Sequence, residues 1–230
     1  MPRHARIAVT AQVYHVISRG NNRERIFWDD DDCHAYLELC RRYKARDGFR
    51  LFHWVLMPNH VHLLLETAAG CSLSRTMQGL QLAYTLRTHK KYRSVGHLWQ
   101  DRFKSFVIER DTYLLECGRY IERNPLRCGM VTDPLAYPWS SYGAYAEAQQ
   151  DAVTDLHEIY ETMGSSGAQR RQAYRDYVCG DRANEEEEFR SRLARGCLGR
   201  DGFAEAIHRQ AVDQRRPRRG RPKLSGNILK

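Results

Sequence analysis

Residues 56–65 read Leu-Met-Pro-Asn-His-Val-His-Leu-Leu-Leu, and the Pro-Asn step inside this stretch separates two apolar segments, 49–57 and 60–67. Such an arrangement predicts two β-strands joined as a hairpin. Since alternate side chains of a strand point to the same face, His60 and His62 are expected to lie side by side. Two imidazoles on one rigid strand can hold a divalent metal ion. A purely structural histidine pair, hydrogen-bonded within the hairpin, fits the spacing equally well.

The segments on either side of this hairpin predict alternating strands and helices. Strands are indicated by their composition, and helices by acidic residues at their starts and apolar residues at helical spacing. The expected strands are 11–18, 49–57, 60–67 and one within 97–109, and the expected helices are 29–47, 72–91 and one that begins at 111 or 112. The resulting order is β-α-β-β-α-β-α. It fits an α+β fold, a ferredoxin-like antiparallel sheet with helices packed on it.

Tyr120 and Asn124 lie four residues apart in the last of these predicted helices, so they can share one helix face. This places a nucleophile beside a third possible metal ligand. Asn124 precedes Pro125, and a residue before proline is disfavoured in the helical conformation, so the helix can also end there. A helical tyrosine is more often part of a core or interface. Spacing alone brings neither residue to His60, and two histidines with an amide oxygen do not determine which metal is bound.

The charge of the chain favours a polyanionic partner. Lys and Arg outnumber Asp and Glu by 37 to 28 over 230 residues, a formal net charge of +9, which points to nucleic acid or a membrane surface. No segment approaches the roughly 20 apolar residues that span a bilayer, and no apolar stretch follows the basic N-terminus as in a signal peptide. We therefore expect a nucleic-acid partner and no membrane association.

The cysteines indicate a reducing environment. There are seven, an odd number, and none has Cys-x-x-Cys spacing, so neither a disulfide framework nor a zinc ribbon is expected. The expected location is the cytoplasm, in association with the nucleoid.

Five stretches of the chain resemble the single-tyrosine HUH transposases, and most closely the REP-associated tyrosine transposases. They occur in the order found in that family and cover roughly the first 145 residues. The stretches are YHVISRGNN at 14–22, MPNHVH at 57–62, GHLWQDRF at 96–103, YIERNPLR at 120–127 and YPWSSY at 137–142.

The resemblance implies a metal-dependent endonuclease and strand transferase that acts on single-stranded, hairpin-forming repeat DNA. His60 and His62 would be ligands of a divalent ion, Mg or Mn, and Tyr120 would be the nucleophile that forms a 5′-phosphotyrosine intermediate. Asn124 falls where related proteins carry an oxygen donor on the tyrosine helix, and it is the third expected metal ligand.

Basic and aromatic residues near these motifs are candidates for DNA contacts, through phosphates or by stacking on unpaired bases. For each arginine, an ordinary role on the solvated surface is equally compatible with the sequence. Arg219 and Arg221 belong to an Arg-Gly-Arg-Pro sequence, which has the form of an AT-hook core but is also typical of a non-specific basic arm. The candidates are Arg19, Arg23, Trp99, Arg102, Phe103, Lys104, Arg123, Arg127, Arg219 and Arg221.

The change of composition near residue 150 predicts three parts. Residues 1–150 would form the catalytic domain, 151–212 a helical accessory region, and 213–230 a basic tail without regular structure. The long extension favours a monomer over a homodimer. Two other functions stay open: a domesticated DNA-binding protein that has lost strand transfer, and an RNA-binding protein on a ferredoxin-like sheet. The second has less support, because no strand is rich in aromatic residues.

Overall fold

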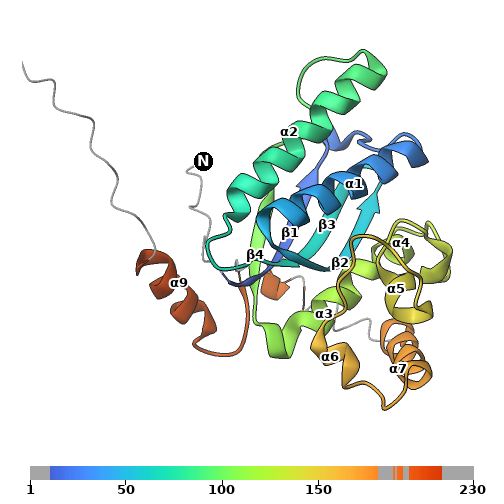
Figure 1. Cartoon of the computed structure of the whole chain (residues 1–230), viewed down its shortest axis with the longest axis vertical. Coiled ribbons are helices and arrows are strands. Elements are labelled where there is room, and N and C mark those ends of the chain that lie inside the picture. The colour runs from blue at the N-terminus through green and yellow to red at the C-terminus, as the bar shows by residue number, and fades with distance from the viewer. Residues whose placement is uncertain (1–10, 181–188, 190, 194–196, 214–230) are drawn as a thin grey trace, which may run out of the picture.

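The computed structural model describes residues 11–180, 189, 191–193 and 197–213 (Figure 1). The elements are β1 (Val13–Arg19), the 3-10 helix η1 (Asn21–Arg23), α1 (Asp30–Asp47), β2 (Arg50–Met57), β3 (His60–Glu66), α2 (Leu73–Tyr92), β4 (Lys104–Ile108), α3 (Arg110–Glu122), α4 (Asn124–Arg127), the 3-10 helix η2 (Pro134–Ala136), α5 (Tyr142–Glu147), α6 (Glu158–Glu161), α7 (Gly167–Cys179), β5 (Cys197–Leu198) and α9 (Phe203–Asp213).

A five-stranded sheet in the order β2-β3-β1-β4-β5 forms the centre of the fold. The pairs among β1 to β4 are antiparallel, and β5 joins β4 in parallel. The α+β fold expected from the sequence is confirmed, including the hairpin of β2 and β3. The strand β5 was not predicted, because two residues carry no hydrophobic period.

Helices cover both faces of the sheet, so that two apolar cores form. Figure 1 shows α1 and α2 crossing one face side by side, and their core includes Tyr14, Val16 and Leu63. The second core includes Val13, Leu64 and apolar residues of α3. The alternation of side chains along β1 and β3 sends neighbouring residues into different cores. His60 and His62, being at even positions like Leu64, therefore face α3.

The helix α3 lies close to the sheet because Gly118 has no side chain. A Cβ atom at this position would come within 2.6–2.7 Å of the His53 ring. The helix ends at Glu122, and Asn124 starts the separate short helix α4 with Pro125 in its first turn. The Asn-Pro step thus ends the tyrosine helix, one of the two outcomes that the sequence allowed.

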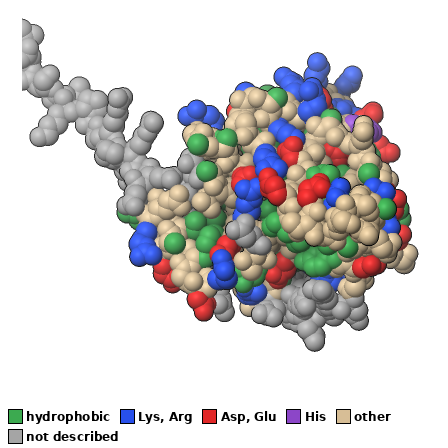
Figure 2. Space-filling view, turned by 60° about the horizontal axis from the view of Figure 1, so that its bottom comes forward, with side chains coloured by type: hydrophobic (Ala, Val, Ile, Leu, Met, Phe, Trp, Pro, Cys, Tyr) green, Lys and Arg blue, Asp and Glu red, His purple; other side chains and the backbone are tan. Residues whose placement is uncertain are grey.

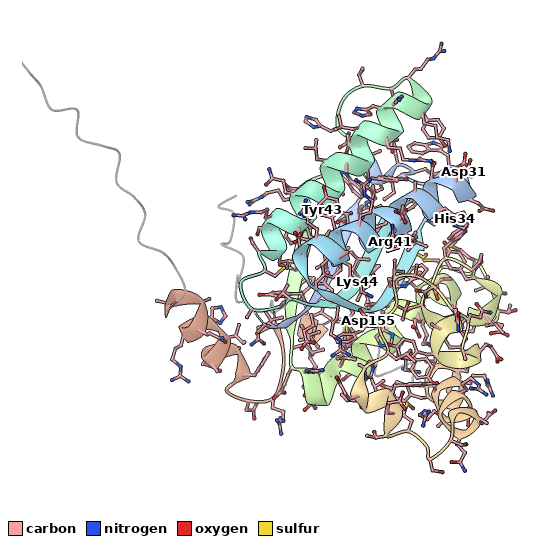
Figure 3. All side chains as sticks on the ribbon, viewed as in Figure 1. Asp31, His34, Arg41, Tyr43, Lys44 and Asp155 are labelled. Atoms are coloured by element: carbon pink, nitrogen blue, oxygen red, sulfur yellow. The ribbon has the colours of Figure 1, made fainter. Side chains whose placement is uncertain are left out.

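The segment after residue 150 is held against the preceding part of the chain by polar contacts. Asp155 forms an ion pair of 2.7 Å with Lys44 of α1, both labelled in Figure 3, and accepts a hydrogen bond of 2.8 Å from the Leu51 amide. Within the predicted helical region 151–212, the described residues form α6 and α7, and α9 begins at Phe203. Residues 214–230 of the predicted basic tail, with Arg219 and Arg221, lie outside the described residues.

His157 makes the free energy of unfolding of the protein sensitive to acid. It is buried, caps α6 by accepting from the Tyr160 amide, and faces His53, Phe52 and Tyr145. Burial lowers its pKa from 6.5 to about 3, helped by His53, Arg110 and Arg50 and opposed by Glu158.

Because the unfolded chain takes up a proton below pH 6.5 and folded His157 does not, the free energy of unfolding should fall as the pH drops through this window. The contribution of this one residue is about 2 kcal/mol between pH 6.5 and 5. Urea unfolding at several pH values measures it. His157→Asn keeps a capping oxygen and should flatten the profile by this amount; an unchanged profile would show that His157 is not responsible.

Candidate functional site

Because of the register of the strands, basic side chains and two histidines lie on the sheet face that α3 covers. Arg19 pairs with His60 across β1 and β3, and Ile17 pairs with His62. Ile17 also pairs with Lys104 on its other side. Directly opposed residues of an antiparallel pair project to the same face. The two histidines, Arg19 and Lys104 therefore share one face, at the end of the strands.

His60 and His62 lie next to each other, with ring centroids 5.0 Å apart. The Nδ1 of His60 is 2.6 Å from the Asn59 side-chain oxygen, and the Asn59 amide nitrogen donates to the Arg23 carbonyl at 2.9 Å. Since a carbonyl oxygen only accepts, His60 donates from Nδ1. This leaves the Nε2 lone pair of His60 for a metal ion, as expected of a ligand oriented by its neighbour.

His15 orients the second histidine, and the sequence interpretation missed it. This residue is fully buried on β1, its Nε2 lies 2.8 Å from His62 Nδ1, and the two rings stack. If His62 donates from Nδ1, its Nε2 is free to bind metal. His15 sits in the YHV motif, at alternate spacing with Val13 and Ile17. The alternate spacing assigns His15 to the same face of the strand as Val13 and Ile17. Its contact with His62 depends on how β1 pairs with β3.

All three imidazoles are held neutral, which metal binding requires. Burial is the largest cause: it lowers the pKa of His15 to about 3, with Arg127 adding to the effect, and that of His60 to about 4, with Arg19 and Arg127 adding. The pKa of His62 is well below its ordinary value, through burial and the nearby His15 and His60. The positive side chains around the histidines thus oppose a further positive charge.

The donor set fits a divalent ion of intermediate softness. Among the described residues, Nε2 of His60 and of His62 makes no hydrogen bond; the His60 side chain is partly exposed, whereas His62 is buried. The described part of the chain contains no cluster of three or more His, Cys, Asp or Glu side chains that could hold a metal. Two neutral imidazoles are ligands for first-row divalent ions, whereas Mg²⁺ prefers oxygen ligands.

Tyr120 is brought to these histidines by α3. Its ring centroid lies 6.2 Å from that of His62 and 6.0 Å from that of His15. The centroid of the Tyr120 ring lies 4.7 Å from that of Phe189, and the Arg127 guanidinium carbon lies 4.1 Å from the Tyr120 centroid. Within the described residues the hydroxyl forms no hydrogen bond and is not a fully buried atom, so it is accessible to a substrate.

Asn124 is buried beside Tyr120, but its polar atoms already have partners. Its nitrogen donates to the carbonyl oxygens of Tyr120 and Ile121 at 3.0 and 2.9 Å, and its oxygen accepts from Arg127 Nη2 at 2.6 Å. The first two bonds satisfy carbonyls at the end of α3. Its predicted role as a third metal ligand stays a prediction, and it would require the oxygen to exchange partners or accept a second contact.

The other predicted DNA-contacting residues separate into two groups. Arg23 and Arg102 are exposed near the site face, like Arg19 and Lys104. Trp99 instead donates to Gln81 and Thr85 of α2, and Phe103 is buried in the core beneath α1 and α2. Arg123 donates to the Val178 carbonyl of α7 at 2.7 Å. These last three placements favour packing roles, because their apolar or donor groups are already engaged.

Basic side chains do not form one continuous positive surface on the face drawn in Figure 2. On the face drawn in Figure 2, basic side chains lie interspersed with acidic ones. No helix of the described ranges is long and apolar enough to cross a membrane.

Comparison with known proteins gives a family, a relative and a solved structure that this chain resembles. The family described as "Transposase IS200 like" matches residues 8–124. A protein from Haemophilus influenzae named as a REP-associated tyrosine transposase is 29% identical over 126 residues, which is 50% of this chain and 69% of that protein. A solved structure of a REP-associated tyrosine transposase bound to a REP hairpin superposes with a TM-score of 0.57 at 17% identity. This match covers 69% of the chain described here and 94% of that one.

Proposed function

Because the chain belongs to the IS200-like transposase family, whose members are HUH tyrosine nucleases, we propose that it is a metal-dependent single-stranded DNA endonuclease and strand transferase. The observation that carries this proposal is the convergence of the half-buried Tyr120 on His60 and His62, whose Nδ1 atoms have partners and whose Nε2 atoms make no hydrogen bond among the described residues. The proposed substrate is hairpin-forming repeat DNA, as in the solved relative, which is bound to a REP hairpin. The expectation of a monomer stays a prediction.

In the proposed reaction, the Tyr120 oxygen attacks a backbone phosphorus. The bond between phosphorus and the 3′-oxygen breaks, a 5′-phosphotyrosine forms, and the leaving oxygen takes up a proton as a 3′-hydroxyl, while the tyrosine proton passes to water. Another 3′-hydroxyl then attacks the phosphotyrosine, which restores the phosphodiester and the tyrosine without external energy. A divalent ion on His60 and His62, with Asn124 as the proposed third donor, would polarise the scissile phosphate. Arg19 and Lys104 hold the backbone on the site face.

The test is a covalent adduct. Purified protein is mixed with imperfect-hairpin oligonucleotides from the source genome, with Mn²⁺ or Mg²⁺ or with a chelator, and resolved on a denaturing gel. A shifted band that appears only with metal supports the nuclease. DNA binding without an adduct, for several hairpins and both metals, would support the domesticated DNA-binding protein instead. One observation favours that second function: the Asn124 oxygen is engaged by Arg127 rather than free.

Removing the ring that orients His62 should weaken the site. His15→Ala leaves His62 Nδ1 without its partner, and loss of such outer partners typically costs about 10–100-fold in metal affinity or activity. We expect a decrease of this size in Mn²⁺ affinity, measured by the free-ion signal in electron paramagnetic resonance, and in adduct rate. His89→Ala on α2, on the other side of the sheet, is the control. Equal affinities for His15→Ala and the unmodified protein would contradict the positioning role.

A further inference from the structure

Arg127 touches both the nucleophile and the expected third metal donor. Its guanidinium carbon lies 4.1 Å from the centroid of the Tyr120 ring, and its Nη2 donates to the Asn124 oxygen at 2.6 Å. The same Asn124 nitrogen holds the carbonyls of Tyr120 and Ile121, so its amide can turn little. One cationic side chain therefore occupies the oxygen of the residue proposed as the third metal donor.

We propose that Arg127 couples the DNA phosphate to the metal site: a backbone phosphate takes over its guanidinium, and this frees the Asn124 oxygen to bind the divalent ion. This inference rests on the proposed function and adds a positioning residue to it. Metal binding and DNA binding then strengthen each other, since any coupling between two ligands is reciprocal.

The exchange is favourable because a phosphate is the stronger partner. A phosphate carries a full negative charge and can accept two parallel hydrogen bonds from the planar guanidinium, whereas the neutral amide oxygen offers neither. The geometry allows the encounter. The phosphorus must come within about 3–3.5 Å of the Tyr120 oxygen to react, and Arg127 lies on the ring that carries this oxygen.

Electrostatic interactions also favour metal binding when DNA is bound. Without DNA, the ligands that the described residues offer a divalent ion, His60 and His62, are neutral and lie beside the cationic side chains of Arg127 and Arg19. The described residues place no cluster of three or more His, Cys, Asp or Glu side chains there to offset this charge. A phosphate brings a negative charge to Arg127 and to the ion at once. We therefore expect the free protein to bind metal weakly and the DNA complex to bind it more strongly.

The experiment measures Mn²⁺ affinity by electron paramagnetic resonance, with and without the hairpin oligonucleotide that binds best in a gel-shift assay. For the unmodified protein, DNA should strengthen Mn²⁺ binding by about fivefold or more, within the usual range of coupling between sites. In Arg127→Met, the DNA-free protein should bind Mn²⁺ more strongly than the unmodified protein, and the gain from DNA should shrink. The double variant Arg127→Met/Asn124→Ala should lose this increase, because no oxygen is released.

Arg42→Met is the matched control, an exposed arginine of α1 on the opposite face of the sheet. It should leave both affinities unchanged. Arg127→Lys, which keeps the charge but not the planar fork, is the second variant should Arg127→Met fail to fold. It should also weaken the coupling to DNA.

Two failures can be told apart. If Mn²⁺ binds through the histidines with DNA present, as shown by its loss in His60→Ala/His62→Ala, but the Arg127 variants keep the full gain from DNA, the coupling role is wrong and the proposed function stands. If the histidine variant binds Mn²⁺ as well as the unmodified protein does in every condition, the proposed function itself is wrong, and the coupling with it.

Discussion

Tyr120→Phe is expected to abolish the covalent protein–DNA adduct while leaving DNA binding and stability nearly unchanged. Loss of a nucleophile costs at least about 10⁴-fold in rate in comparable enzymes. The fold should tolerate the change because, among the described residues, the Tyr120 hydroxyl makes no hydrogen bond. A phenylalanine ring can also keep the contacts with Phe189 and Arg127. The measurement is the adduct on a denaturing gel, beside a gel shift with the same oligonucleotide.

Tyr113→Phe is the matched control for this substitution. Tyr113 lies on the same helix, and its hydroxyl accepts a hydrogen bond from Arg192, away from the histidines. This variant should form the adduct at the normal rate. An adduct that persists in Tyr120→Phe would assign the chemistry to another residue and remove the basis of the proposed reaction.

Glu122→Ala is expected to have the largest effect on stability. Glu122 is fully buried two residues after Tyr120, and it accepts hydrogen bonds from Tyr174 at 2.6 Å and Ser141 at 2.7 Å, with His53 Nδ1 at 2.9 Å. Its removal takes this acceptor from all three buried groups, and Ser141 keeps only the longer bond to the Trp54 carbonyl at 3.3 Å. Leaving a buried polar group unsatisfied costs about 1–3 kcal/mol for each group, so the total is a large part of the 5–15 kcal/mol that stabilises a typical domain.

Urea unfolding measures this free energy. The control is Glu147→Ala, whose carboxylate forms an exposed ion pair with Arg175 at 2.8 Å; such pairs contribute about 0–1 kcal/mol. Because Glu122 joins α3 to α5 and α7, its loss should also loosen the helix that carries Tyr120 and reduce the adduct rate. Similar unfolding free energies for the two variants would show that the buried network contributes little.

Short-range patterns were sufficient to predict the framework of this protein. The Pro-Asn turn and the apolar segments around it predicted β2 and β3 to within one residue at most boundaries, and the acidic and serine helix starts predicted α1 and α2. These features depend on propensities and spacings within a few residues, which the sequence displays directly. For the same reason His60 and His62 could be placed on one face, and the Asn-Pro step could be recognised as a place where the tyrosine helix can end.

Only the tertiary structure showed which side chains meet at the site. His15 and His62 are 47 residues apart in sequence, and their contact follows from the register of β1 against β3. Phe103 and Trp99 are candidates for base stacking in sequence, but the burial of Phe103 and the hydrogen bonds of Trp99 to α2 favour packing roles.

The sequence by itself determined the hairpin and its flanking strands and helices, their order along the chain, and the residue types that the proposed nuclease reaction needs. The tertiary structure decided that His15 contacts His62, and that Glu122 joins His53, Ser141 and Tyr174 in one buried network. The physical reason is that secondary structure follows from local backbone and side-chain preferences. Such networks instead depend on the positions of segments 19 to 69 residues apart, which pairing and packing of the whole chain establish together.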